Sequence, residues 1–212
     1  MLTILFLHGW GFDRTVWTPV AERLEGFRRV FCDRGYFEEA AASENSGPVL
    51  AAAHSFGAMQ LLSSLPEKCV GIAAINGFDR FAADAHFPGV PTRVLDRMIA
   101  RFAKEPRAVL AEFREKCGST DSFGAIDTRR LSADLGALRS DDRREETARF
   151  AGPILSLGGD ADPILSPAMQ EAVFASADDV MRESVAGGGH LLPLTHPGLC
   201  AERISAMAKM LP

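Results

Sequence analysis

The chain has 212 residues, of which 47% are hydrophobic, a size that suits one domain with a substantial core and excludes two large domains. Its net charge of -5 is modest and its basic residues are interspersed with acidic ones, which argues against nucleic acid as a partner. The four cysteines form no CxxC pair and no histidine stands at zinc-ligand spacing, so we expect reduced thiols in a cytoplasmic protein without metal or cofactor.

The first third of the chain alternates between strand and helix signals. Residues 2–7 are continuously apolar and lack a preceding basic segment, which predicts a buried strand rather than a signal peptide. No other run approaches the length of a membrane span, so no membrane partner is expected. A helix is expected over residues 15–24. Further strands are predicted over residues 29–33, 48–53 and 69–76, and this alternation implies a parallel sheet with right-handed crossovers.

The strand rhythm then stops and resumes late in the chain. Helical spacing appears over residues 92–102 and 106–117, strands return over 152–157 and 180–185, and a helix closes the chain over 197–210. A helical insertion of this size predicts a lid over the carboxyl edge of the sheet, where open α/β sheets bind ligands. We expect a core from residues 1–77 and 151–212, a lid over 78–150, and a short linker or reduced helix in the small-residue run 40–47.

A serine lies at one predicted strand-to-helix junction, in the segment Ala53-His54-Ser55-Phe56-Gly57. Small residues two positions before and after a serine allow the sharp turn of a nucleophile elbow, although the usual first glycine is alanine here. The turn exposes the hydroxyl of Ser55 and directs the amide of Phe56 toward a substrate carbonyl. Taken alone, the pattern fits an ordinary helix N-cap about equally well.

Two later segments favour the nucleophile interpretation. Asp162 follows the strand over 152–157, and His190 follows the last strand, so both are expected at the same sheet edge as Ser55. The chain order Ser, Asp, His is that of a catalytic triad on this kind of sheet. In such a triad His190 takes the serine proton and Asp162 orients the imidazole.

Other residues compete for these roles or support them. Asp160 is an alternative acid, but Asp162 is favoured because it directly precedes a proline, as is usual for this loop. His196 is an alternative base that we expect instead to help start the last helix. We expect His54 to pack behind the elbow, His8 to support the loop after the first strand, and His86 to be solvated.

The second donor to a developing oxyanion is expected in the segment His8-Gly9-Trp10-Gly11, whose glycines let the backbone approach a ligand. The amide of Trp10 is the natural partner of the amide of Phe56. The indole ring of Trp10 would then form a wall of the acyl pocket.

With these motifs in view, the chain resembles the α/β-hydrolases, and within them the pimeloyl-acyl-carrier-protein methyl ester esterases of biotin synthesis. The resemblance rests on the HGWG start, the elbow, the Phe87-Pro88-Gly89-Val90 opening of the insertion, residues 131–139 and the segment around His190. It implies an α/β-hydrolase fold, with a mostly parallel sheet flanked by helices and a helical lid. It also implies catalysis by Ser55, Asp162 and His190, an ester site lined by Trp10 and Phe56, and acyl-chain contacts near Phe113.

The resemblance further implies an acidic acyl carrier protein docked on basic lid residues, and a basic patch beside a pocket would steer such a partner. A solvated helix face with i,i+4 ion pairs to Asp96, Glu105, Glu112 and Glu115 is an equally good interpretation. The chain departs from the family pattern: the usual two N-terminal strands are missing and residues 34–37 replace a common turn. The basic residues concerned are Arg93, Arg97, Arg101, Lys104, Arg107, Arg114 and Lys116.

The sequence therefore predicts a serine carboxylesterase, with the methyl ester of a pimeloyl carrier protein as the favoured substrate. A general short-chain carboxylesterase or lactonase would use the same residues. A ligand-binding protein that keeps a hydrolase fold without catalysis is the alternative from another class. Labelling of Ser55 by a fluorophosphonate separates the two esterase hypotheses from the binding protein.

Overall fold

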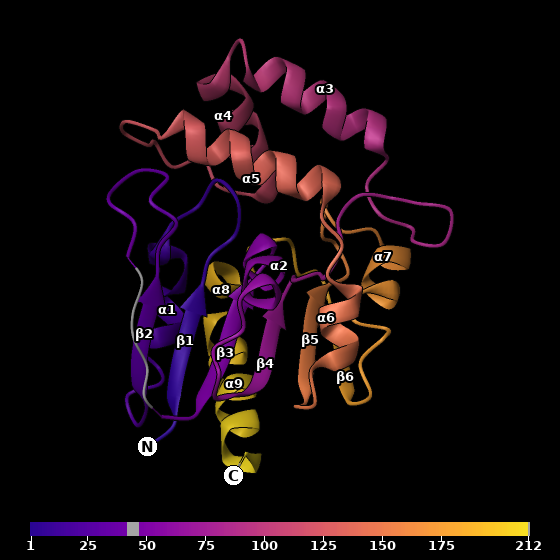
Figure 1. The fold of residues 1–212 in the computed structure, drawn as a ribbon. Helices are drawn as coiled ribbons and strands as arrows, with labels where there is room; N and C mark the ends of the chain where they lie inside the picture. Colours follow the sequence, from indigo (N-terminus) through magenta and orange to yellow (C-terminus); the bar gives the residue numbers. More distant parts are fainter. Residues whose placement is uncertain (42–46, 212) are drawn as a thin grey trace.

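A single parallel sheet forms the centre of the computed structural model, which describes residues 1–41 and 47–211 (Figure 1). All neighbouring strands pair in parallel, and their order is β2-β1-β3-β4-β5-β6. The predicted strands are confirmed, with ends displaced by two residues at most. Their bounds are β1 Thr3–Leu7, β2 Arg28–Cys32, β3 Val49–His54, β4 Cys69–Ile75, β5 Ile154–Gly159 and β6 Val180–Val185.

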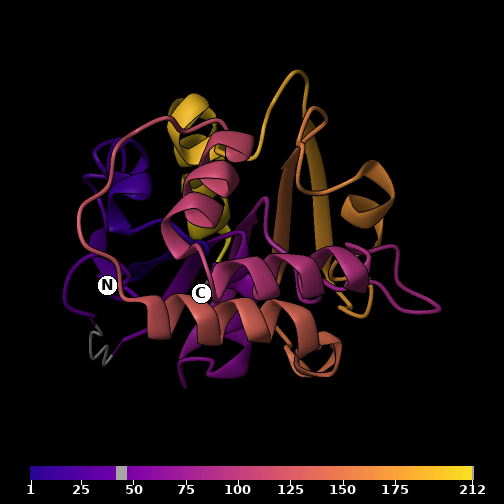
Figure 2. The ribbon, with the colours of Figure 1, turned by 90° about the horizontal axis from the view of Figure 1, so that it is seen from above.

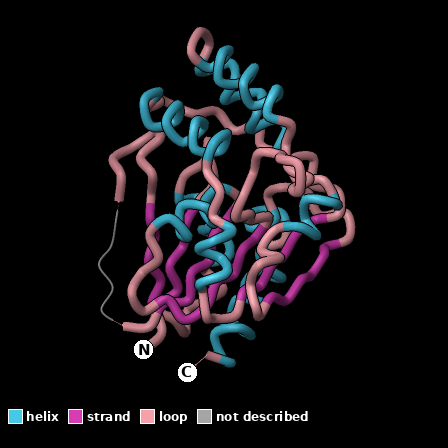
Figure 3. Tube along the Cα trace, turned by 45° about the vertical axis from the view of Figure 1, so that its right-hand side comes forward, coloured by secondary structure: helices cyan, strands magenta, loops and turns pink. Residues whose placement is uncertain are grey.

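Helices cover both faces of the sheet, as the apolar runs require. On one face lie α1 (Thr18–Ala21), α8 (Leu192–Thr195) and α9 (Pro197–Met210), behind the sheet in Figure 1. On the other lie α2 (Phe56–Ser63) and α6 (Arg144–Arg149), while α7 (Pro167–Ala172) joins β5 to β6. Figure 3 shows the strands enclosed between these helices.

Side chains of β3 alternate between two apolar cores, one on each face. Ala51 and Ala53 belong to the core on the α2 side, and Leu50 and Ala52 to the core on the α9 side. The closing helix α9 contributes buried side chains such as Ile204 to the second core. This period of two places successive strand residues on opposite faces, so the carboxyl edge of the sheet is left to the loops.

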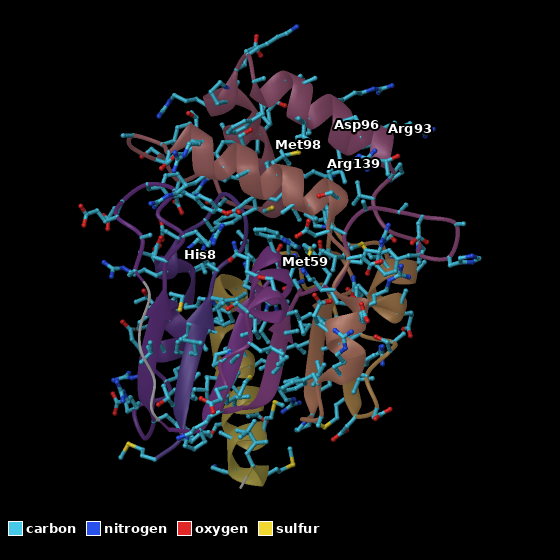
Figure 4. The ribbon with its side chains drawn as sticks, in the orientation of Figure 1. His8, Met59, Arg93, Asp96, Met98 and Arg139 are labelled. Carbon is cyan, nitrogen blue, oxygen red and sulfur yellow. The ribbon has the colours of Figure 1, made fainter. Side chains whose placement is uncertain are left out.

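Three helices lie over that carboxyl edge and are called here the upper layer: α3 (Thr92–Phe102), α4 (Pro106–Cys117) and α5 (Thr128–Ser140). Seen from above, α3 and α5 lie side by side (Figure 2). An ion pair of 2.7 Å between Asp96 of α3 and Arg139 of α5 links them at one end (Figure 4). The helices predicted over 92–102 and 106–117 are confirmed, and Gly118 ends α4 in a left-handed conformation that favours glycine.

The prediction of a single helix over residues 15–24 was wrong. The chain forms a 3-10 turn at Arg14–Trp17, opened by an amide of Thr15 that donates to the Asp13 side chain, and then the short helix α1. Pro19 has no amide hydrogen to donate to the carbonyl of Thr15, so a continuous α-helix loses a bond there.

The prediction of a linker or reduced helix over 40–47 falls largely outside the described residues. Across residues 1–41 and 47–211, no helix is both long and apolar enough to cross a membrane.

Candidate active site

Three side chains from separate loops meet at the carboxyl edge of the sheet. The Ser55 hydroxyl lies 3.0 Å from Nε2 of His190, and Nδ1 of His190 lies 2.8 Å from Oδ2 of Asp162. Ser55 follows β3, Asp162 follows β5 and His190 follows β6, so strand ends distant in sequence become neighbours. The structure thus brings the three predicted residues into one hydrogen-bonded chain, and all three are buried.

The backbone at Ser55 makes the sharp turn that the sequence pattern predicts. Its φ of 54° and ψ of -125° are rare for a residue with a side chain. A Cβ at Gly57 would lie 2.7 Å from the carbonyl oxygen of Leu7 and 2.8 Å from that of His8, so only glycine fits there. Ala53, by contrast, is accommodated as a fully buried strand residue. The missing first glycine therefore does not prevent the turn.

Asp162 is held by donors on both of its carboxylate oxygens. The amides of Ile164 and Leu165 donate to Oδ1 at 2.7 and 3.1 Å, while His190 and the side-chain amide of Asn76 lie 2.8 Å from Oδ2. Burial alone would raise the pKa of Asp162, but the hydrogen bond and charge of His190, together with the amides of Ile164 and Leu165, outweigh burial and lower that pKa. The carboxylate is therefore charged at neutral pH and can orient the imidazole.

The loop after β1 passes directly over the serine. A Cβ at Gly9 would lie 2.9 Å from Cβ of Ser55 and 3.3 Å from its Oγ, so the glycine allows this approach. Within the described part of the chain, the main-chain amides of Trp10 and Phe56 donate no hydrogen bond. Two unpaired amides next to a hydroxyl form a site that can accept a negatively charged oxygen.

The Trp10 side chain connects this loop to the upper layer. Its Nε1 donates to the carbonyl oxygen of Leu131 in α5 at 2.8 Å, and its ring meets the ring of Phe113 in α4 at 4.9 Å. Trp10 is 1% exposed. The predicted pocket residues Trp10 and Phe113 are therefore in contact, and helices of the upper layer close over the loop.

The competing residues occupy supporting positions. Asp160 accepts the amide of Gly187, which is a turn contact. His8 bridges the loop after β1, with Nδ1 2.9 Å from the carbonyl of Gly9 and Nε2 accepting the amide of Arg34. His86 is exposed. The side chain of His196 contacts Thr195 and makes no capping bond to α9, so only its position is that expected of a helix start.

His54 packs behind the elbow, as expected, and is fully buried. Its Nε2 lies 2.9 Å from the carbonyl oxygen of His190, and its Nδ1 has no partner among the described residues. Burial, together with the nearby charge of His190, lowers the pKa of His54 to about 3. The ring is therefore neutral at physiological pH and holds the main chain that carries His190.

A largely apolar cavity of about 350 Å³ opens within the upper layer. Phe113 lines it, and so does Ile164, whose amide donates to Asp162. The cavity therefore adjoins the hydrogen-bonded chain through Ile164, and through Phe113 it adjoins Trp10. Other lining residues include the apolar Leu95, Val109, Leu135 and Leu138 and the cationic Arg97, Arg101 and Lys116.

The basic residues of the upper layer are not one solvated group. Arg114 is buried, donates to the carbonyl of Gly11 at 2.8 Å and lies over the ring of Phe12, so its inclusion in a surface patch was wrong. Arg101 forms a two-bond ion pair with Glu112, and Arg107 donates to the carbonyl oxygens of Phe123 and Gly124. The remaining four have no charged partner among the described residues: Arg93, Arg97, Lys104 and Lys116.

Sequence reasoning missed the contact of Asn76 with Asp162. The signal was present, because Asn76 is a polar residue that closes a buried strand at the same sheet edge. Its partner, however, follows the next strand in the sheet and lies 86 positions away in sequence.

Comparisons with known proteins agree with this architecture. The sequence profile described as the alpha/beta hydrolase family matches residues 4–203. The chain is 25% identical to a pimeloyl-[acyl-carrier protein] methyl ester esterase of Sodalis glossinidius, over 92% of this chain and 88% of the relative. It is also 25% identical to the biotin biosynthesis bifunctional protein BioHC of Cellvibrio japonicus, over 92% of this chain but only 45% of that relative's length.

A solved esterase structure from Exiguobacterium antarcticum superposes with a TM-score of 0.86 at 17% identity, covering 99% of this chain and 92% of the other. At that identity the likeness establishes the fold alone.

Proposed function

This chain belongs to the alpha/beta hydrolase family, and on that premise we propose that it is a serine carboxylesterase that cleaves its substrate through an acyl-enzyme. The observation that carries the proposal is the hydrogen-bonded chain from Ser55 through His190 to Asp162. The unpaired amides of Trp10 and Phe56 lie next to the serine end of this chain. Nucleophile, base and orienting carboxylate in this order are what acyl transfer by a serine requires.

In the first step the Ser55 hydroxyl attacks the ester carbonyl carbon. His190 accepts the hydroxyl proton on Nε2, 3.0 Å away, and then donates it to the departing alcohol oxygen. Asp162, bonded to Nδ1, stabilises the imidazolium between these transfers. In the second step His190 takes a proton from water, the resulting hydroxide attacks the acyl-enzyme, and the acid leaves as Ser55 regains its proton.

Both steps place negative charge on the former carbonyl oxygen. The amides of Trp10 and Phe56 are the donors that stabilise this charge in the proposed mechanism. Gly9 brings the Trp10 amide close to the nucleophile, and the start of α2 presents the Phe56 amide. Loss of one such donor typically costs about 10²- to 10³-fold in kcat.

For the substrate, we propose the methyl ester of a pimeloyl group carried by an acyl carrier protein. Support comes from the two curated relatives and from the apolar cavity, which is large enough for an acyl chain and adjoins Asp162 through Ile164. Residues 78–150 would then act as a lid over the acyl chain of the substrate. The unpaired cations Arg93, Arg97, Lys104 and Lys116 would face the acidic carrier.

The acyl-enzyme is tested by labelling with a fluorophosphonate. Wild-type protein should react at Ser55, and Ser55→Ala should not react. Ser63→Ala is the matched control. Ser63 is exposed at the end of α2, the helix that follows Ser55, so its replacement should leave labelling unchanged. Absence of labelling in folded wild-type protein would favour a ligand-binding protein without catalysis.

The substrate is tested separately. The gene should restore biotin-independent growth to a strain that lacks this esterase, and Ser55→Ala should not. Purified Arg93→Glu/Lys104→Glu protein, in which both exchanged side chains are exposed and lie outside the cavity lining, should lose activity on the carrier-linked ester while retaining it on a free pimelate methyl ester. Lys209→Glu, on α9 at the far end of the sheet, is the control. Equal activity on carrier-linked and free esters, in wild type and variant, would favour a general short-chain carboxylesterase or lactonase.

A further inference from the structure

Asn76 occupies the position between the nucleophile and the acid. It directly follows β4, the strand that separates β3 from β5, so Ser55 lies on one side of it and Asp162 on the other. Its Nδ2 donates to Oδ2 of Asp162 at 2.8 Å and to the carbonyl oxygen of Gly189 at 3.1 Å. One amide group thus contacts both the carboxylate and the residue that precedes His190.

The local backbone also favours asparagine. Asn76 has a φ of 48°, a left-handed conformation that asparagine tolerates better than most residues with a side chain. Its main-chain amide donates to the carbonyl of Leu157 at 2.7 Å, and the carbonyl of Ile75 accepts the amide of Ser55 at 3.1 Å. The side chain is therefore presented from a main chain fixed on both sides.

The unsatisfied side-chain oxygen of Asn76 indicates that the two hydrogen bonds from Nδ2 explain why asparagine occupies this position. This oxygen is buried and has no hydrogen-bond partner among residues 1–41 and 47–211, which is unfavourable. Rotating the amide by 180° would be worse, since the oxygen would then face two acceptors, on Asp162 and Gly189. The cost of the unsatisfied oxygen is therefore offset by the two hydrogen bonds that Nδ2 donates to Asp162 and Gly189.

We propose that Asn76 is a positioning residue, which fixes the Asp162 carboxylate and the His190 loop relative to each other so that the imidazole meets Ser55 in line. The part that concerns catalysis rests on the proposed esterase function. Because Nδ2 and His190 share the same carboxylate oxygen, Asn76 also limits how much negative charge that oxygen presents to the imidazole.

Several groups around this contact can carry a charge. His190 and His54 lie on one side, and His54 is held neutral by burial. Burial raises the pKa of the Cys117 thiol in α4, and the charge of Asp162 adds to this, so that thiol is neutral. Asp160, Glu171, Arg182 and Glu183 line the cavity that Asn76 also lines. Asp160 accepts the amide of Gly187, Arg182 donates to the carbonyl of Val173, and Glu183 pairs with Arg203. A new charge at position 76 would act most strongly on Asp162, 2.8 Å from Nδ2, and through the shared oxygen on His190.

Two substitutions test the proposal without straining the backbone. Asn76→Gly keeps the left-handed conformation and removes the amide; we expect kcat to fall about 10-fold with KM within about twofold. Asn76→Asp can still donate while its carboxyl is protonated, and a carboxyl this close to another keeps its proton to raised pH. Its activity should be close to wild type near pH 6 and fall about 10-fold more than that of Asn76→Gly near pH 9.

Gln170→Met is the matched control, because Gln170 also ties the acid loop through a side-chain amide, at the carbonyls of Gly159 and Leu165, without touching Asp162. It should lower thermal stability and leave the pH profile unchanged. The same pH profile for Asn76→Asp and wild type, or equal kinetics for Asn76→Gly and Gln170→Met, would overturn the proposal.

A spectroscopic measurement separates this proposal from the esterase proposal. The proton between His190 Nδ1 and Asp162 should give a downfield NMR resonance that broadens in Asn76→Gly and stays sharp in Gln170→Met. An unchanged resonance in Asn76→Gly would refute the positioning role, whether or not wild-type protein hydrolyses esters. Loss of fluorophosphonate labelling in wild type would refute the esterase proposal alone.

Discussion

Burial of His54 should make the protein sensitive to mild acid. The folded state holds the pKa of His54 at about 3, against an ordinary value of 6.5, so the unfolded chain binds a proton that the folded chain excludes. Stability is unaffected above pH 6.5 and falls as the pH drops from 6.5 toward 3. From pH 7 to pH 5 this one group should remove about 2 kcal/mol of unfolding free energy.

The substitution that isolates this effect is His54→Gln, whose side-chain amide can still donate to the carbonyl of His190 but does not titrate. Urea unfolding at pH 7 and at pH 5, followed by the fluorescence of the buried Trp10 and Trp17, gives the loss for each protein. The variant should lose about 2 kcal/mol less than wild type over this interval. All carboxylates are common to both proteins and cancel in the difference.

His86→Gln is the control, because His86 is exposed and its replacement should leave the pH dependence unchanged. An equal loss of stability in wild type and His54→Gln would show that burial does not hold His54 neutral.

Three further results are expected. Gly57→Ala should cost about 1–3 kcal/mol in urea unfolding, since its Cβ meets two carbonyl oxygens, whereas Gly124→Ala, with nothing within 4 Å, should be close to neutral; equal effects would refute the close approach. Trp10→Phe should remove the bond to α5 and speed amide exchange in that helix about fivefold by mass spectrometry, and unchanged exchange would contradict the link. Asp134→Asn should cost about 1–3 kcal/mol in the same unfolding assay, because this buried carboxylate accepts from the half-exposed Arg34 and from Tyr36; a neutral result would show that the pair contributes nothing.

The parts of the fold that follow from local pattern could be predicted from the sequence. The strands β1, β3 and β4 were found because apolar runs of five to seven residues closed by polar residues have few other interpretations in an α/β chain. The meeting of Ser55, Asp162 and His190 could be expected for the same reason, since parallel strands end at one edge. Their catalytic roles stay predictions until the labelling experiment is done.

The parts that depend on contacts between distant segments could not be predicted. Arg114 reads as a surface charge in its own helix, and only the fold places its guanidinium over the ring of Phe12 and against the carbonyl of Gly11. Asn76 reads as the end of a strand until β5 brings Asp162 beside it. The broken helix near Pro19 is different, because a proline inside a helical pattern was a local signal that the apolar spacing outweighed.

At Ser55 the stability of the fold and the proposed catalytic role favour different residues, because the backbone there is strained. A side chain at φ 54° and ψ -125° costs on the order of 1–3 kcal/mol that glycine would not incur. A library of variants selected only for resistance to proteolysis should therefore enrich Ser55→Gly, and a library selected for ester hydrolysis should reject it. In this protein, then, selection for resistance to proteolysis alone would remove the proposed nucleophile, and only selection for ester hydrolysis would preserve it.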